Sequence, residues 1–309
     1  MRQIEIVEVG PRDGYQGIQA FIPTERKIDH LRRLVATGLK RIEIGAFVSP
    51  RAIPQFRDVE EVLGAALKME GLEAQVLVPN EKYGRRALDA GARHLAFVLS
   101  VSPAHNQANV RRSPLESVSE YARFIEMAGP DSRIRLYLST AFDCPFTGCV
   151  REDDVLALLQ MIMPLRNDIE VCLCDTTGRA VPDQVERLFT RAMAHFPKVG
   201  GWAVHTHDTY GLGCANAYAA WRAGVRIADA AYAGLGGCPF APGASGNVAS
   251  EDLVWMFERM GIATGIDLAA LLDVARNGAQ ITGGISGGRV RAAFDATAAR
   301  RNGLSRTCM

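Results

Sequence analysis

Two histidines separated by one residue, His205 and His207, are the strongest indication of chemistry in the sequence. They lie in an apolar run, residues 201–207, that is typical of a β-strand. Side chains two apart on a strand point to the same side, so both imidazoles are expected to face one site. Two histidines and a carboxylate are a common ligand set for a divalent metal ion. The alternative is a pair of structural histidines held by hydrogen bonds.

The remaining ligands of such a metal ion can be sought at other strand ends. Asp13 follows the apolar run at residues 4–9 and is the natural third ligand, and the side-chain amide of Asn247 could complete the set. Oxygen and nitrogen ligands of this kind suit Mg²⁺ or Mn²⁺ better than zinc, which often uses thiolates. None of the seven cysteines forms a C-x-x-C pair, which argues against a zinc module.

Two further residues could take part in proton or charge transfer. Arg12 lies beside Asp13 at a glycine-flanked strand end, where a guanidinium could stabilise an enolate or oxyanion. A surface salt bridge is the alternative. Cys238 lies in a glycine-rich segment, residues 234–247, that could swing over the site, and a thiol there could donate or accept a proton. The alternative for Cys238 is a small buried residue in a packed turn.

The elements that must position these residues repeat along the chain. Apolar runs typical of strands occupy residues 4–9, 41–47, 73–79, 94–101, 133–140, 169–175, 201–207 and 226–234. Amphipathic stretches between them predict helices, for example over residues 23–38, with Thr24 as N-cap and Gly38 as stop, and over 113–129, 151–166 and 182–196.

This alternation predicts a (β/α)8 TIM barrel, residues 1–262, with a short C-terminal helical extension, residues 263–309, in the same domain. A doubly wound open sheet is the rival, but its glycine fingerprint is absent after the first strand. The active site of a TIM barrel lies at the C-terminal ends of the strands. Polar residues collect at those ends, including Gln16, Glu43, Asp175 and Thr176. Residues 102–113, with His105, Arg111 and Arg112, form either a border of the site or a solvated loop.

Composition excludes several classes of partner. The 309 residues include 35 basic and 34 acidic side chains, so a net charge of +1 provides no global field for nucleic acid or an anionic membrane. No apolar stretch is long enough to span a membrane. The N-terminus has the pattern of a strand and not of a signal peptide, and the dispersed, odd-numbered cysteines indicate a reducing compartment, so we expect a cytoplasmic protein.

Together these residues resemble the 3-hydroxy-3-methylglutaryl-CoA lyase family of metal-dependent TIM-barrel acyl-CoA lyases. The motifs that carry the resemblance are VGPRDGYQ, IEIGAFVSP, CDTTG, VHTHDTYG and AGLGGCPFAPGASGNVASEDLV. The resemblance implies a divalent metal held by Asp13, His205, His207 and Asn247. It also implies Arg12 as enolate stabiliser, Cys238 as a mobile acid or base, and Glu43 and Asp175 as acidic active-site residues.

The implied reaction is cleavage of a C–C bond in a 3-hydroxyacyl-CoA, with Asp13 or a coordinated histidine as base. For the parent substrate the products would be acetyl-CoA and acetoacetate. A condensing enzyme that joins acetyl-CoA to a 2-oxoacid on the same barrel is the first alternative, and a non-catalytic acyl-CoA-binding barrel is the second. By analogy with other TIM barrels we expect a homodimer.

Three departures from the family pattern bear on the substrate. Gly17-Ile18 stands where the family usually has Asn-Glu, and Gly45-Ala46 stands where it has Thr-Ser. Loss of that serine hydroxyl removes a partner for the acyl portion of the substrate, so we expect a roomier, less polar site and a different or larger acyl group. Residues 281–288 include four glycines where a polar, basic cluster often binds CoA. Arg289 and Arg291 remain there as candidates for anion binding, and Gln16 and Thr176 are the other candidates for substrate binding.

Overall fold

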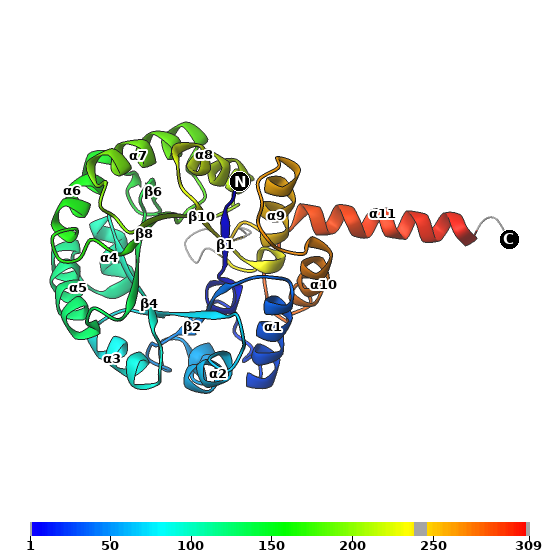
Figure 1. The fold of residues 1–309 in the computed structure, drawn as a ribbon, viewed down its shortest axis with the longest axis horizontal. Coiled ribbons are helices and arrows are strands. Elements are labelled where there is room, and N and C mark those ends of the chain that lie inside the picture. Colours follow the sequence, from blue (N-terminus) through cyan, green and yellow to red (C-terminus); the bar gives the residue numbers. More distant parts are fainter. Residues whose placement is uncertain (1, 238–245, 307–309) are drawn as a thin grey trace.

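Eight parallel strands close into a barrel in a computed structural model that describes residues 2–237 and 246–306. The order around the barrel is β1-β10-β9-β8-β5-β4-β3-β2, and helices surround it (Figure 1). The strands are β1 (Glu5–Glu8), β2 (Arg41–Ala46), β3 (Glu73–Val78), β4 (His94–Ser100), β5 (Arg133–Ser139), β8 (Glu170–Asp175), β9 (Gly201–Thr206) and β10 (Ile227–Ala230). The predicted TIM barrel is confirmed.

The helices of the outer ring follow the strands in turn. They are α1 (Thr24–Ala36), α2 (Val59–Ala66), α3 (Glu81–Asp89), α4 (Pro103–Val110), α5 (Pro114–Ala128), α6 (Glu152–Ile162), α7 (Pro182–His195), α8 (Gly213–Ala223) and α9 (Ser250–Arg259). Most of them bury one apolar face; in α5, for example, Val118, Tyr121 and Phe124 face inward because they recur at helical spacing.

The first helix differs from its prediction at one end. Thr24 is not the N-cap, because Pro23 occupies that position and no side-chain cap is formed. The Thr24 hydroxyl instead donates to Asp58 at 2.9 Å. The predicted stop is confirmed: Gly38 has φ +98, and a Cβ there would lie 2.5 Å from the carbonyl oxygen of Gly265.

Two further segments differ from the sequence-based expectation. The last strand ends at Ala230, and residues Tyr232–Gly234 form a 3-10 turn instead of continuing the strand. Residues 102–113 contain α4, which Ser102 caps by accepting a hydrogen bond from the His105 backbone at 3.4 Å. A small hairpin, β6 (Asp143–Cys144) and β7 (Gly148–Cys149), follows β5.

The interior of the barrel is unusually polar below the site. Arg41 and Arg135 are both buried, and their partners are also strand residues: Arg41 donates to Glu170 at 2.9 Å, and Arg135 donates to Asp229 at 2.5 Å. Alternate residues of each strand point inward, so these charges form a layer beneath the C-terminal mouth.

Two helices follow the barrel. α10 (Leu268–Gly278) packs against α1 and α9, whereas α11 (Arg289–Arg306) projects away from the barrel (Figure 1). This confirms the predicted C-terminal helices. Among the described residues, no helix is long and apolar enough to cross a membrane.

Candidate active site

A cavity of about 720 Å³ opens at the C-terminal ends of the strands. Its floor contains Arg12, Asp13, His205 and His207. Its rim is formed by segments after β2, β3 and β4, including residues 48–53, 79–83 and 105–112. The cavity therefore lies where TIM-barrel active sites form.

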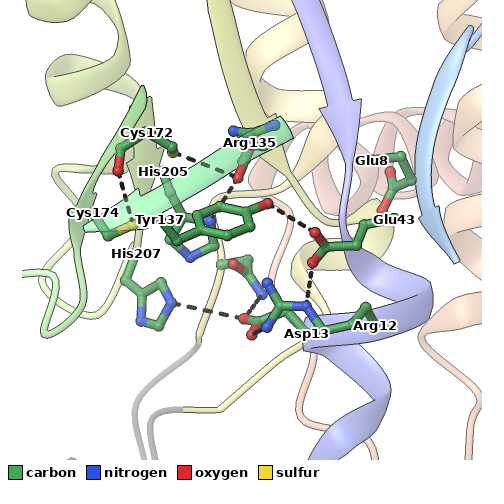
Figure 2. A network of polar contacts seen from close by, with 12 residues as sticks. Glu8, Arg12, Asp13, Glu43, Arg135, Tyr137, Cys172, Cys174, His205 and His207 are labelled. Atoms are coloured by element: carbon green, nitrogen blue, oxygen red, sulfur yellow. Dashed lines mark hydrogen bonds and ion pairs between the residues drawn. The ribbon is translucent and has the colours of Figure 1, made fainter. Parts of the chain in front are cut away.

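Asp13, His205 and His207 converge on the floor of this cavity. One ligand atom of each residue lies within 4.8 Å of the others, and the two imidazole rings are 5.1 Å apart. His207 Nε2 is 3.9 Å from Asp13 Oδ2 (Figure 2). The three residues thus form a candidate metal site, as their spacing predicted.

Orphaned polar atoms beside this cluster fit a bound cation. Asn247 donates to Asp13 at 2.8 Å and to the Leu235 carbonyl at 3.0 Å, which holds it next to the cluster. Its Oδ1 atom and His207 Nδ1 are buried and have no hydrogen-bond partner among the described residues. Buried polar atoms are normally satisfied, so these two are candidates for a ligand. Nitrogen and oxygen donors of this kind suit a hard or borderline divalent ion.

Arg12 lies on the floor between two carboxylates. A turn of π-helix, Gly10–Gly14, follows β1 and turns Arg12 and Asp13 into the cavity. The guanidinium donates to both Glu43 and Asp13 (Figure 2). Burial disfavours its charge, but the carboxylates outweigh burial and raise the pKa of Arg12. Arg12 is therefore a fixed positive charge beside the candidate metal site.

Asp13 is held as a carboxylate by the same arrangement. Burial alone would raise its pKa, but Arg12 and the two histidines outweigh burial and lower the pKa of Asp13 to about 2. Burial lowers the pKa of His207 to about 4, with a further contribution from His205. The floor thus presents one anion and one neutral imidazole at neutral pH, which is the protonation state that metal binding needs.

Glu43 positions Arg12 and does not line the cavity itself. It is completely buried in β2, and the Tyr137 hydroxyl donates to it at 3.1 Å while the Gln75 amide donates at 2.5 Å. These contacts fix the carboxylate that Arg12 binds. Gln75 and Tyr137 were not identified from the sequence, although Tyr137 falls on the inward side of β5 together with Arg135.

His205 is oriented from below by a second pair of residues missed in the sequence. Its Nδ1 atom lies 3.1 Å from Asp229, and Asp229 accepts from Arg135 at 2.5 Å. Burial would raise the pKa of Asp229, but Arg135 and His205 outweigh it and lower that pKa. A carboxylate on one imidazole nitrogen leaves the other free to bind a metal, which is the usual outer-shell arrangement of metal-binding histidines.

Asp175 and Thr176 lie at the end of β8 but have different surroundings. Thr176 lines the cavity, and its hydroxyl accepts from the Thr140 backbone at 2.8 Å. Asp175 is buried behind the lining, where it accepts from the backbone of Ala180 at 3.2 Å and from Asn216 at 3.4 Å. Burial raises the pKa of Asp175 to about 6. Its contacts are those of a residue that positions the loop after β8.

The structure separates the two other candidates for substrate binding. Gln16 lines the cavity and donates to Asp13 at 3.2 Å. Arg289 is not among the described lining residues; its backbone amide donates to Asp252 at 2.9 Å, and its guanidinium lies near Gly211. Arg291 donates to the Gly287 carbonyl at 2.7 Å. Neither arginine faces the described cavity.

Cys238 lies outside the described residues, but the residues on both sides of its segment reach the site. Gly237 lines the cavity, and Asn247 contacts Asp13. A Cβ on Gly246 would lie 2.5 Å from the Gly237 backbone nitrogen, so the two ends of the segment touch. Among the described cysteines, Cys174 also lines the cavity, and burial raises the pKa of its thiol.

The departure at Gly45-Ala46 has two separate consequences. A Cβ at Gly45 would lie 3.1 Å from Val59 of α2, so this glycine adds no room to the cavity. Ala46 pairs in register with Leu77, which lines the cavity. Ala46 itself is buried beside that wall, so the missing hydroxyl would have lain next to Leu77.

Loop residues 102–113 border the cavity, as one of the two interpretations predicted. His105, Arg111 and Arg112 all line it, and Arg51 after β2 joins them. His105 is buried and hydrogen-bonded to Ser100 at 2.7 Å, and burial lowers its pKa to about 4.

The closed parallel barrel and the charged cluster at its C-terminal mouth define a TIM-barrel protein with a candidate metal site. The family model described as HMGL-like matches residues 3–277, and the chain belongs to this family. It is a carbon–carbon lyase of the hydroxymethylglutaryl-CoA lyase type.

Several relatives support this assignment. The chain is 39% identical to (R)-citramalyl-CoA lyase of Chloroflexus aurantiacus, with 88% of this chain and 89% of the relative covered. It is 38% identical to hydroxymethylglutaryl-CoA lyase of Pseudomonas mevalonii, covering 89% and 91%. An HMG-CoA lyase from Acinetobacter baumannii, solved with coenzyme A and 3-methylmalate, superimposes with a TM-score of 0.87 at 40% identity, covering 94% and 95%.

Proposed function

We propose that this protein cleaves a C–C bond of 3-hydroxy-3-methylglutaryl-CoA or a related 3-hydroxyacyl-CoA in a divalent-metal-dependent reaction. The products are acetyl-CoA and a keto acid such as acetoacetate. The observation that carries the proposal is the convergence of Asp13, His205 and His207 beside Arg12 on the floor of one cavity. A binding protein has no need for this combination of metal ligands and a fixed cation.

Mg²⁺ or Mn²⁺ is the proposed ion, and Asp13, His205, His207 and Asn247 would hold it. When bound, such an ion polarises the tertiary hydroxyl of the substrate and lowers its pKa. The fit rests on the nitrogen and oxygen donors and on the orphaned Asn247 Oδ1 and His207 Nδ1 atoms.

The side chains on the floor of the cavity are proposed to carry out proton transfer and to stabilise the developing negative charge. The hydroxyl proton passes to Asp13 or to one of the two histidines, the hydroxyl becomes the carbonyl of the keto acid, and the bond to the thioester's α-carbon breaks. The electron pair of that bond forms the acetyl-CoA enolate. Arg12, fixed by Glu43, stabilises the negative charge on the enolate oxygen. Cys238 is the proposed donor of the proton that completes acetyl-CoA.

Substrate choice is tested by a panel. Hydroxymethylglutaryl-CoA and citramalyl-CoA are the first two members, because relatives with these activities in their names are similarly close. Acetyl-CoA release with Mg²⁺ present identifies the substrate. Release of free CoA from acetyl-CoA and 2-oxoacids, with no cleavage of any panel member, would contradict the lyase direction and favour the condensing alternative.

We also propose that the protein is a homodimer, by analogy with other TIM barrels. Light scattering coupled to size-exclusion chromatography tests this directly. A mass of one 33.5 kDa chain at micromolar concentration would contradict it.

A further inference from the structure

The arginines of the cavity are concentrated on one side of its rim. Arg51 follows β2, and Arg111 and Arg112 follow α4, which in turn follows β4. Strands β2, β3 and β4 are neighbours in the barrel, so these segments form one continuous wall. Arg112 reaches across the segment after β3, because its guanidinium lies 3.5 Å from the Pro79 carbonyl.

The charge on this wall is largely uncompensated. Among the described residues, neither Arg51 nor Arg111 forms an ion pair, and Arg112 has only Glu120 at 3.8 Å. Asp13 is the one acidic residue among those described as lining the cavity, and it is already bound to Arg12 on the floor. A chain with a net charge of +1 therefore places two arginines without an ion pair among the described residues, Arg51 and Arg111, beside one opening.

Among the described residues, the segment where the family usually has its basic cluster contributes no arginine to the cavity lining. Residues 281–288 pack on the segment after β10: Gly236 donates to the Ile285 carbonyl at 3.2 Å, and Gly287 donates to that of Ala233 at 2.8 Å. Gly284 lies against Leu235 and Ile18, so a Cβ there would be 3.5 Å from the isoleucine side chain. The two departures at Ile18 and at the glycines thus meet in one apolar contact. Arg289 and Arg291, which follow this segment, face other groups.

We propose that Arg51, Arg111 and Arg112 form an anion-binding subsite for the phosphate groups of the CoA moiety. This inference rests on the proposed acyl-CoA substrate. The thioester must reach Arg12 and Asp13 on the floor, while the flexible pantetheine arm lets the phosphates remain at the rim. Guanidinium groups bind phosphate oxygens in bidentate, charge-assisted hydrogen bonds. Arg51 and Arg111 are exposed and lose no ion pair with a described residue on binding, while Arg112 has only Glu120 at 3.8 Å.

The test compares ligands with and without phosphates by isothermal titration calorimetry on the full chain. In the double variant Arg51→Gln/Arg111→Gln, the Kd for CoA should rise at least about tenfold, which corresponds to 1.4 kcal/mol. Binding of pantetheine, which lacks the phosphates, should be unchanged. Both substitutions remove charge at exposed positions without breaking an ion pair among the described residues, so folding should be preserved.

Two control variants match the loss of charge. Arg85→Gln removes an exposed arginine of α3 that pairs with Glu81 away from the cavity lining, and Arg289→Gln removes the arginine expected from the family pattern. Neither should weaken CoA binding. Unchanged CoA affinity in the double variant, equal weakening of pantetheine, or a loss confined to Arg289→Gln would overturn the subsite.

The outcome is separable from that of the proposed function. Wild-type protein that binds neither CoA nor pantetheine would contradict the acyl-CoA substrate itself. Wild-type protein that binds CoA with the same affinity as the double variant would contradict only the arginine subsite. The titration is repeated with dephospho-CoA, which lacks the 3′-phosphate. If the double variant binds CoA and dephospho-CoA equally well while the wild type prefers CoA, the arginines contact the 3′-phosphate. If the double variant binds both ligands more weakly than the wild type does, the arginines contact the diphosphate.

Discussion

The floor and the rim of the cavity differ in how their charges are partnered. On the floor, Arg12 and Asp13 are less than one-tenth exposed, and each is held by neighbouring side chains. On the rim, Arg51 and Arg111 are exposed and have no carboxylate partner among the described residues. Charges fixed before the substrate arrives need little reorganisation during reaction, which suits chemistry. Unpaired charges at an opening suit a ligand that brings its own anions.

This comparison predicts that changes to the floor act on turnover and changes to the rim act on binding. The largest effect should come from removing the metal. Exhaustive chelation should reduce cleavage by about a thousandfold or more, because the ion supplies several kcal/mol of charge stabilisation, and Mg²⁺ or Mn²⁺ should restore it. His207→Ala should behave like the chelated enzyme and resist rescue. Full activity after chelation would contradict the metal mechanism.

The second largest effect is expected at Cys238. Cys238→Ser should lower kcat by roughly 10²–10⁴-fold, the usual contribution of a positioned acid, while metal and CoA affinities stay unchanged. Cys174→Ser is the matched control, because Cys174 lines the described cavity and burial raises the pKa of its thiol, which does not suit it to donate a proton to the enolate. Equal loss in both variants, or wild-type turnover in Cys238→Ser, would refute the assignment.

Arg12 should rank third. Arg12→Lys retains the positive charge, but an ammonium group cannot bind Glu43 and the enolate at the same time as the planar guanidinium can. We therefore expect kcat to fall roughly 10²-fold, as it does when an oxyanion-hole donor is lost. KM should change little. Thermal unfolding provides the control, since a buried Glu43 with a poorer partner also lowers stability. A change in KM alone would place Arg12 among the binding residues.

The cluster of candidate ligands on the floor could be predicted from the sequence, because the strand order of a closed barrel brings these residues together. His205 lies in β9 and His207 directly follows its last residue, Thr206, while Asp13 follows β1, so the closed barrel places all three at the same mouth. Tyr137 and Asp229 could not be found this way. Tyr137 meets Glu43 across the barrel interior, whereas Asp229 lies beside His205 in register on the neighbouring strand β10. Both contacts depend on how the strands pair and close.

The direction of side chains in irregular segments could not be predicted from the sequence either. The register of β2 shifts between Glu43 and Gly45, which turns Gly45 toward α2 and away from the cavity. Arg289 retained its place in the family pattern, but the packing of residues 281–288 decides where its side chain lies. The glycines of that segment are explained by the same packing: Gly283 and Gly288 have φ of +79 and +91, and Gly284 and Gly287 make close backbone contacts.

Below the floor, Asp229 should tune the metal site with a smaller effect. Asp229→Asn should weaken Mn²⁺ binding by roughly 10–100-fold, as is usual when an outer-shell partner of a metal-binding histidine is lost. Mn²⁺ titration followed by electron paramagnetic resonance measures this without turnover. At saturating Mn²⁺ most of kcat should return. A permanent loss of kcat with unchanged Mn²⁺ affinity would contradict the orienting role.

The smallest expected effect is at Ala46. Ala46→Ser adds a hydroxyl beside Leu77 on the cavity wall, and the ratio of kcat/KM between hydroxymethylglutaryl-CoA and citramalyl-CoA should shift by less than about tenfold. Gly45→Ala is the control, since its methyl group would face α2. A larger change in that ratio from Gly45→Ala would mean that the wall is not where selection occurs.

The metal-dependent lyase reaction is tested most directly by the stoichiometry of cleavage with and without metal. Metal-loaded enzyme is incubated with each 3-hydroxyacyl-CoA of the panel, and acetyl-CoA and the keto acid are quantified together. We expect equal amounts of both products from at least one substrate, and neither product from the chelated enzyme or from Asp13→Ala. Metal-loaded enzyme that cleaves no member of the panel, or Asp13→Ala that cleaves as fast as wild type, would contradict it.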